Sequence, residues 1–225
     1  MFITFEGQEG AGKSTQTKLL YSHFLERGCN VILTREPGGT DIAEKIRHIL
    51  KDPGSAYMSK KAEALLYIAA RAQLADEVIL PHLAAGGVVL SDRFTDSTIA
   101  YQGFGNGLDL GILISMSNFA GNCLVPDITF YLQVDVKEGL ERKLAQGTPD
   151  RIEQKDLSYH MRVKKGYEYL LRNFPQRIFA INAELPRDEI HKTIISHIEN
   201  MKIEGGNTHE TYYGHHSRRR RLSNY

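Results

Sequence analysis

The sequence predicts an α/β fold in which one parallel sheet of five strands is covered by helices on both faces. Short apolar runs alternate with longer helix-like stretches along the chain, and this alternation is typical of parallel strands joined by crossover helices. A glycine-rich segment follows the first apolar run, as in many sheets that bind ligands at the carboxyl ends of their strands. The length of 225 residues suits a single core of this kind.

The first half of the chain supplies two of the strands. Residues 2–5, Phe-Ile-Thr-Phe, have the aromatic and β-branched side chains that favour a strand, and the glycine-rich segment then leads into a helix that begins near Gly12. Residues 30–33 form the second expected strand, and a loop rich in Gly and Pro follows it. Helices are expected at residues 42–50 and 60–80, which contain neither Gly nor Pro.

The second half continues the same alternation. Three further apolar runs are the remaining expected strands, at residues 87–90, 128–134 and 178–181. Helix-like stretches lie between and after them, at residues 107–120, 136–144, 157–173 and 186–201. We expect residues 1–204 to form one domain.

The composition is that of an ordinary globular protein, with 41% hydrophobic and 24% charged residues. No apolar run approaches the roughly 18 residues that a membrane span needs. The first strand begins directly after Met1, so we expect no signal or transit peptide. Cys29 and Cys123 have no metal-type spacing and are expected to be reduced thiols of a cytoplasmic protein; a disulfide or ligand role is the alternative.

The carboxyl-terminal segment, residues 205–225, differs from the rest. It has four basic residues, Arg218 to Arg221, and one acidic residue, whereas residues 1–204 have 24 basic and 26 acidic residues, a net charge of −2. The segment contains few aliphatic side chains, so we expect a disordered basic tail. Contact with RNA, an acidic surface or a partner is the alternative.

A phosphate-binding motif lies between the first strand and the first helix. The motif G-x-x-x-x-G-K-[ST] matches a continuous segment, which we expect to bind ATP: Gly7, Gln8, Glu9, Gly10, Ala11, Gly12, Lys13 and Ser14, followed by Thr15. Its backbone N–H groups would surround the phosphates, Lys13 would reach the β and γ phosphates, and Ser14 would bind Mg²⁺. The alternative is a tight turn without a ligand.

Charged side chains follow three of the other expected strands. Asp92 closes an apolar run and fits the acid near Mg²⁺, acting through bound water. Asp135 also follows a strand, but its position favours a cap on the next helix. Arg35 and Arg93 would flank the phosphate loop and bind a second anion on an acceptor molecule; surface ion pairs are the alternative.

A polar loop near the middle of the second half is expected to fold over the nucleotide as a lid, at about residues 142–155. Position 10 of the phosphate loop is glycine, so Lys13 is the only cationic side chain that this loop supplies. Phosphoryl transfer requires more positive charge than that, and Arg151 is the lid residue best placed to provide it. The alternative is a solvated pair of Asp150 and Arg151.

The motifs GQEGAGKST, TREPGGT, LLYIAARAQ, SDRFTDSTIAYQG and DRIEQ, in this order, resemble those of bacterial thymidylate kinases. The resemblance implies a P-loop NTPase fold of the nucleoside monophosphate kinase type. It implies transfer of the γ-phosphoryl group of ATP to dTMP, giving dTDP and ADP for dTTP synthesis, with Mg²⁺ and in a homodimer. Another monophosphate kinase, or a P-loop switch that controls a partner, remains an alternative.

The same resemblance implies roles for individual residues around dTMP. Glu9 matches an acid that contacts the 3′-hydroxyl, and both Arg35 and Arg93 match arginines at the phosphate. Pro37 matches a proline near the base that often follows a cis peptide bond. The remaining matches are to residues that contact the base or sugar, namely Tyr67, Arg71, Ser97, Tyr101 and Gln102.

Within that set, Tyr67 would stack on thymine and Arg71 would donate to the thymine carbonyl O4. Their i, i+4 spacing places both on one helix face, although a core aromatic residue and a surface arginine would have the same spacing. Tyr101 would exclude a 2′-hydroxyl.

The catalytic residues implied are Lys13, Arg93 and Arg151. With Gly10 in the loop and Arg151 in the lid, the chain resembles the branch of the family whose catalytic arginine lies in the lid. No general base is expected, because the second pKa of a phosphate monoester is about 6 and the attacking oxygen is largely ionised at neutral pH.

Overall fold

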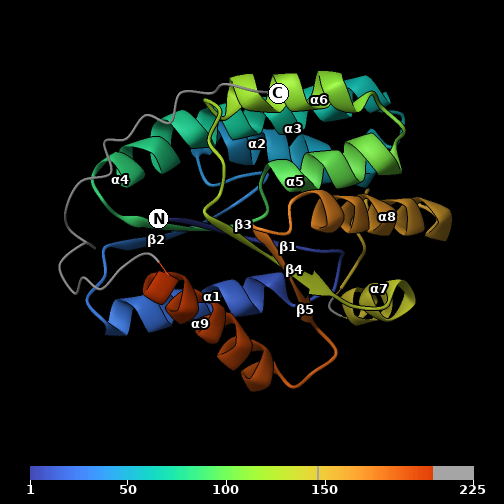
Figure 1. Cartoon of the computed structure of the whole chain (residues 1–225). Helices are drawn as coiled ribbons and strands as arrows, with labels where there is room; N and C mark the ends of the chain where they lie inside the picture. The colour runs from blue at the N-terminus through green and yellow to red at the C-terminus, as the bar shows by residue number, and fades with distance from the viewer. Residues whose placement is uncertain (146, 205–225) are drawn as a thin grey trace.

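The computed structural model describes residues 1–145 and 147–204 and contains the expected five-stranded parallel sheet. Its strands are β1 (Phe2–Glu6), β2 (Val31–Arg35), β3 (Val88–Asp92), β4 (Ile128–Gln133) and β5 (Ile178–Asn182). They are arranged in the order β2-β3-β1-β4-β5, all parallel (Figure 1). Since β1 is central, the loop that follows it opens into the crevice at the carboxyl ends of the strands.

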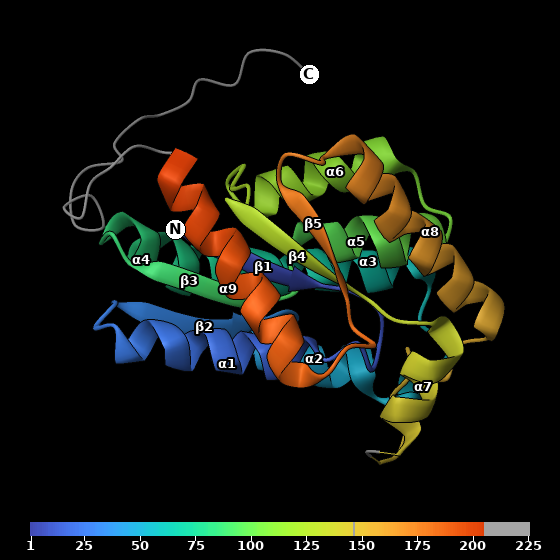
Figure 2. The same cartoon turned by 60° about the horizontal axis from the view of Figure 1, so that its bottom comes forward.

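Helices cover both faces of the sheet. They are α1 (Lys13–Glu26), α2 (Asp41–Lys51), α3 (Lys60–Leu74), α4 (Leu80–Ala84), α5 (Thr95–Thr98), α6 (Leu110–Ala120), α7 (Val136–Leu144), α8 (Leu157–Asn173) and α9 (Arg187–Glu204). Helices α1 and α9 lie on one face, whereas α3, α5, α6 and α8 lie on the other (Figures 1 and 2). None of the helices in the described ranges is long and apolar enough to cross a membrane.

The strand residues alternate between two cores. Ile3 and Phe5 pack with Leu20 of α1 and Ile194 of α9. Phe2 points to the other face and packs in a cluster that includes Phe94. This period of two, with both faces buried, explains why the strands are nearly continuous apolar runs in the sequence.

Two segments differ from the sequence prediction. The helix expected at residues 60–80 is α3 followed by a π-helical segment (Ala75–Ile79) and the start of α4. No helix was expected between residues 94 and 106, yet α5 and a π-helical segment, η3 (Ile99–Gly105), lie there. Segment η3 packs closely on α8, where a Cβ on Gly166 would lie 2.7 Å from Ala100 Cα. Tertiary packing of this kind has no local sequence pattern.

Asp135 caps α7, as predicted, because its carboxylate accepts a hydrogen bond from the backbone N–H of Lys137 at 2.9 Å. The expected tail at residues 205–225 lies outside the described residues, as does residue 146 of the expected lid.

Candidate active site

The phosphate loop depends on glycine for its backbone path. Gly7, Gly10 and Gly12 have φ angles of 140°, 70° and 85°, which other residues rarely adopt. A Cβ at Gly10 would also lie 2.0 Å from the carbonyl oxygen of Gly139 in α7. The loop therefore cannot carry an arginine at position 10 without moving α7.

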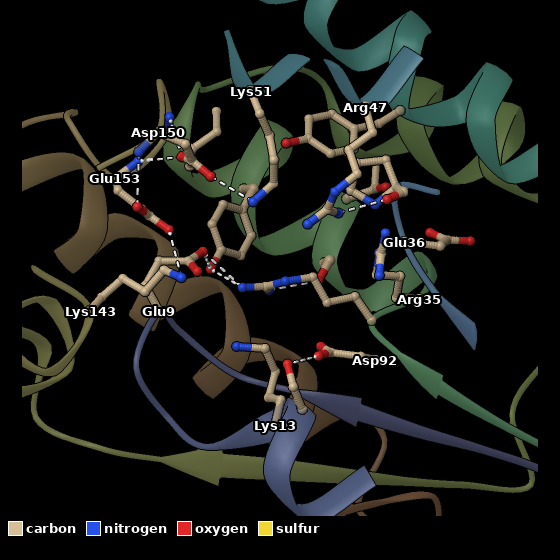
Figure 3. Close-up of a pocket in the computed structure, with 18 of the residues that line it drawn as sticks. Glu9, Lys13, Arg35, Glu36, Arg47, Lys51, Asp92, Lys143, Asp150 and Glu153 are labelled. Carbon is tan, nitrogen blue, oxygen red and sulfur yellow. Dashed lines mark hydrogen bonds and ion pairs between the residues drawn. The ribbon is translucent and has the colours of Figure 1, made fainter. Parts of the chain in front are cut away.

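Lys13 and Ser14, which are predicted to contact the ATP phosphates and Mg²⁺, lie at the start of α1. Lys13 Nζ donates a hydrogen bond to the carbonyl oxygen of Gln8 at 2.6 Å, so its ammonium group lies over the loop. Burial and the neighbouring charge of Arg93 lower the pKa of Lys13 to about 8. Ser14 Oγ donates to Asp92 Oδ2 at 2.5 Å, which joins the two residues predicted to hold Mg²⁺ (Figure 3).

A cavity of about 260 Å³ extends from the phosphate loop toward α2 and α3. It brings together most of the residues predicted from the sequence: Glu9, Gly10, Gly12, Lys13, Ser14, Thr15, Arg35, Pro37, Tyr67, Arg71, Asp92, Arg93, Ser97, Tyr101 and Gln102. Three loop residues, Gly7, Gln8 and Ala11, do not line it. Gln8 is buried instead, and its Nε2 donates to the backbone of His160 at 2.8 Å.

Arg93 lines this cavity and is hydrogen-bonded to three other residues that line it. Its Nη2 donates to Glu9 Oε1 at 2.8 Å and to the Tyr101 hydroxyl at 2.9 Å, and its Nη1 donates to Ser97 Oγ at 3.1 Å. Burial alone raises the pKa of the Glu9 carboxyl, but the charges of Arg93 and Lys13 lower it to about 2. Glu9 is therefore an anion that fixes Arg93 beside the phosphate loop.

Arg71 is held by an acid that the sequence analysis missed. Its side chain is 1% exposed, its Nε donates to both carboxylate oxygens of Glu36 at 3.0 Å, and its Nη2 donates to one of them at 2.5 Å. The alternative of a surface arginine at this position is therefore wrong. Arg71 also donates to Phe94 and Ser117, which leaves one of its five N–H donors for a ligand.

Two further residues predicted to contact dTMP, Tyr67 and Pro37, also line the cavity. Tyr67 is partly buried and lines the cavity with Arg71. The peptide bond between Glu36 and Pro37 is cis, as the resemblance implied. Glu36 comes directly after β2 and directly before Pro37, and an acid that follows a strand is a signal that could have revealed it.

The sequence analysis considered two roles for Arg35, binding of an anion in the site and a surface ion pair, and the structure has features of both. It lines the cavity, yet its side chain is 53% exposed and pairs with Glu44 at 2.9 Å. Glu44 also accepts the backbone N–H of Gly39 at 2.8 Å, so this ion pair orders the loop after β2.

Arg151 is not among the residues that line the cavity in the described structure, and the catalytic role implied for it stays a prediction. Its guanidinium is buried, where Nη1 donates to Glu63 Oε2 at 2.7 Å and Nε donates to the backbone of Leu50 at 2.7 Å. The solvated pair with Asp150 is not formed either, because Asp150 binds Lys51 at 2.6 Å. Glu63 lies 88 residues away in the sequence, so no local pattern announces this countercharge.

Two cationic residues of the cavity, Arg47 and Lys51, were missed, and a third, Lys143, belongs to the expected lid. Arg47 and Lys51 come from α2, four residues apart and so on one helix face, and Lys143 comes from α7. Arg47 Nη1 donates to the carbonyl oxygen of Pro37 at 2.7 Å, and Lys143 lies 3.6 Å from Glu153. Figure 3 shows Arg47 and Lys51 across the cavity from Lys13 and Asp92. Cationic side chains therefore lie on both sides of the cavity.

Arg151→Ala is expected to lower the free energy of unfolding by about 3 kcal/mol, because it removes one partner from a buried ion pair. Arg142→Ala is the matched control: Arg142 pairs with Glu138 at the surface of α7, and its loss should cost less than about 1 kcal/mol. Urea unfolding of both variants tests this. An Arg151→Ala protein of unchanged stability whose kcat falls by roughly 100-fold or more would restore the catalytic role.

The central parallel sheet, the phosphate loop after β1 and the Ser14–Asp92 pair define this chain as a P-loop nucleotide-binding protein. The family model described as thymidylate kinase matches residues 5–194. The chain belongs to the thymidylate kinase family.

Individual relatives agree with this assignment over most of the chain. A thymidylate kinase of Oceanobacillus iheyensis is 41% identical over 219 residues, covering 95% of this chain and 97% of the relative. One of a Roseiflexus species is 48% identical over 195 residues, covering 81% and 86%. The crystal structure of thymidylate kinase from Ehrlichia chaffeensis superposes with a TM-score of 0.73 at 33% identity, covering 88% of this chain and 98% of that one.

Proposed function

We propose that the cavity holds dTMP next to the γ-phosphate of ATP and that the chain, as a thymidylate kinase, transfers this phosphoryl group to give dTDP and ADP for dTTP synthesis. One observation carries the proposal: the phosphate loop and the pocket between α2 and α3 are parts of one cavity. Glu9 belongs to the phosphate loop and binds Arg93 and Tyr101 of the pocket, so the loop would contribute residues to both nucleotide sites.

The donor side would bind the ATP phosphates through the loop N–H groups and Lys13. The oxygen atoms of Ser14 and Asp92 suit Mg²⁺, which usually takes one or two protein ligands together with phosphates and water. The described residues contain no cluster of three His, Cys, Asp or Glu side chains that would suit another metal. When bound, Mg²⁺ would neutralise charge that develops on the transferred phosphoryl group.

On the acceptor side, different residues would bind the phosphate, the sugar and the base of dTMP. Arg35 and Arg93 would hold the phosphate; within the described residues the Nε of Arg93 has no hydrogen-bond partner and can take this contact. Glu9 is ionised because its pKa is about 2, and it would accept a hydrogen bond from the 3′-hydroxyl of dTMP.

Recognition of the base and sugar would come from the pocket walls. Tyr67 would stack on thymine, the remaining donor of Arg71 would reach O4, and Ser97 and Gln102 would contribute further contacts. Tyr101 is held by hydrogen bonds to Glu9 and Arg93, which suits a rigid barrier against a 2′-hydroxyl.

Catalysis would depend on position and charge. The dTMP oxygen is largely ionised at neutral pH, so Lys13 and Arg93 need only align it and stabilise the equatorial oxygens of the transferred group. Because Arg151 binds Glu63, we assign the cationic contact from the lid side to Lys143.

We further propose a homodimer in the cytoplasm. The exposed side chains of Leu65 on α3 and of Ile112 and Phe119 on α6 support a subunit interface on these neighbouring helices. Cys29 and Cys123 are free, which suits a reducing compartment.

A coupled kinase assay with dTMP, dUMP, dCMP, AMP and GMP tests the proposed function. We expect dTMP to have the highest kcat/KM, and Arg71→Ala to reduce the preference for dTMP over dCMP by about 10- to 100-fold, since a hydrogen bond to a charged group contributes about 1.5–3 kcal/mol. If another monophosphate is the best acceptor of the wild-type protein, the proposed substrate is wrong. ATP hydrolysis without any acceptor would instead indicate a P-loop switch.

A further inference from the structure

Glu6 is a buried carboxylate that none of the roles above uses. It is the last residue of β1, lies directly before Gly7, and is 0% exposed. Three donors surround it: the backbone N–H of Phe94 at 2.8 Å from Oε1, and the hydroxyls of Ser97 and Tyr167 at 2.6 Å and 2.8 Å from Oε2.

The first of these contacts acts on the backbone of Arg93. Arg93 has a φ angle of 79°, in a region that costs a residue other than glycine about 1–3 kcal/mol. The peptide group between Arg93 and Phe94 is bound at both ends, because Ser91 Oγ donates to its carbonyl oxygen at 2.7 Å and its N–H donates to Glu6. Glu6 therefore helps to hold the backbone turn that points Arg93 into the cavity.

The other two contacts act on the guanidinium. Ser97 and Tyr167 each donate to Glu6, and each accepts a hydrogen bond from Arg93 Nη1 at 3.1 Å. Because the carboxylate takes the hydrogen of both hydroxyls, their lone pairs face Arg93. One side chain thus orients both the backbone and the head group of the same arginine.

An anion at this position is costly to keep. Burial, reinforced by the charge of Asp96, raises the pKa of the Glu6 carboxyl to about 7. The ionised Glu6 carboxylate therefore lowers the free energy of unfolding while it orders Arg93. Such a loss of folding stability is typical of residues that are kept for function.

We propose that Glu6 is a positioning residue that sets Arg93, through Phe94, Ser97 and Tyr167, in place for the phosphate of the acceptor. This inference rests on the proposed function, in which Arg93 binds that phosphate.

A double-mutant cycle tests the proposal. Glu6→Gln keeps the shape of the side chain but replaces one acceptor oxygen with a donor amide. We expect it to lower kcat/KM for dTMP by about 30-fold, mainly through KM, while KM for ATP changes less than about twofold. In an Arg93→Ala protein the same change should lower kcat/KM by less than about twofold, because the residue it orients is gone. An equal loss in both backgrounds would overturn the proposal.

Asp96→Asn is the matched control. Asp96 is also a buried acid, but it binds Arg177 at 2.7 Å; since its charge raises the pKa of Glu6, its loss would leave Glu6 an ionised acceptor for Phe94, Ser97 and Tyr167. The change should lower the unfolding temperature and leave KM for dTMP within about twofold of wild type. If Asp96→Asn raises this KM as much as Glu6→Gln does, the effect is general to the core and the proposal fails.

Tyr167→Phe provides a second route if Glu6→Gln does not fold. It removes one hydroxyl between Glu6 and Arg93, so we expect a loss of about 5-fold in kcat/KM for dTMP that disappears in the Arg93→Ala background. Persistence of that loss would contradict the proposal. A wild-type protein that does not phosphorylate dTMP at all would overturn the proposed function itself, which separates the two failures.

Discussion

Arg93→Ala is expected to lower kcat/KM for dTMP by about 1,000-fold, equivalent to roughly 4 kcal/mol of lost transition-state stabilisation. Two effects combine. The variant lacks a cation between the phosphate loop and the acceptor pocket, and it leaves the partly buried Glu9 without its ion-pair partner. Both effects disfavour an anionic acceptor in the cavity.

Steady-state kinetics with dTMP and ATP varied separately measure this effect. Arg35→Ala is the control for loss of charge at the same cavity; since Arg35 is half exposed and paired with Glu44, it should cost only about 10-fold. An Arg93→Ala protein that keeps the wild-type KM for dTMP would show that another residue binds the phosphate.

Lys13→Ala is expected to lower kcat by about 1,000-fold or more, because the ammonium group contributes most where charge develops on the transferred phosphoryl group. The fold should survive, since the hydrogen bond that Lys13 Nζ donates is to Gln8 of the loop that Lys13 belongs to. Single-turnover measurements with saturating ATP separate this effect from weaker binding.

Lys18→Ala is the matched control for Lys13, because Lys18 is an exposed lysine on the same helix, α1. It should leave kcat within about twofold of wild type. If Lys13→Ala changes only KM for ATP, Lys13 binds the ground state and transition state equally, and the assigned catalytic role is wrong.

The sequence predicted those parts of the site whose chemistry is local. The phosphate loop is one continuous segment, and Arg35, Asp92 and Arg93 follow strands whose carboxyl ends meet at one edge of the sheet. The periodicity of the strands was enough to place that edge. Most of the loop therefore lines one cavity with Arg35, Asp92 and Arg93.

The partners of the buried acids could not be predicted in the same way. Glu6, Glu36 and Glu63 are each buried against residues distant in the sequence, and nothing in their own segments identifies those partners. This explains why the sequence did not indicate the ion pair of Arg151: an arginine next to an aspartate in the expected lid has the pattern of a catalytic or solvated residue, and only the fold brings Glu63 within hydrogen-bond distance.

A crystal structure with dTMP and a non-hydrolysable ATP analogue would test most directly the claim that the phosphate loop contributes residues to both nucleotide sites. The claim predicts that thymine stacks on Tyr67, that the dTMP phosphate lies within hydrogen-bond distance of Arg93, and that Glu9 contacts the sugar. Density for dTMP outside this cavity, or a dTMP phosphate held without Arg93, would contradict it.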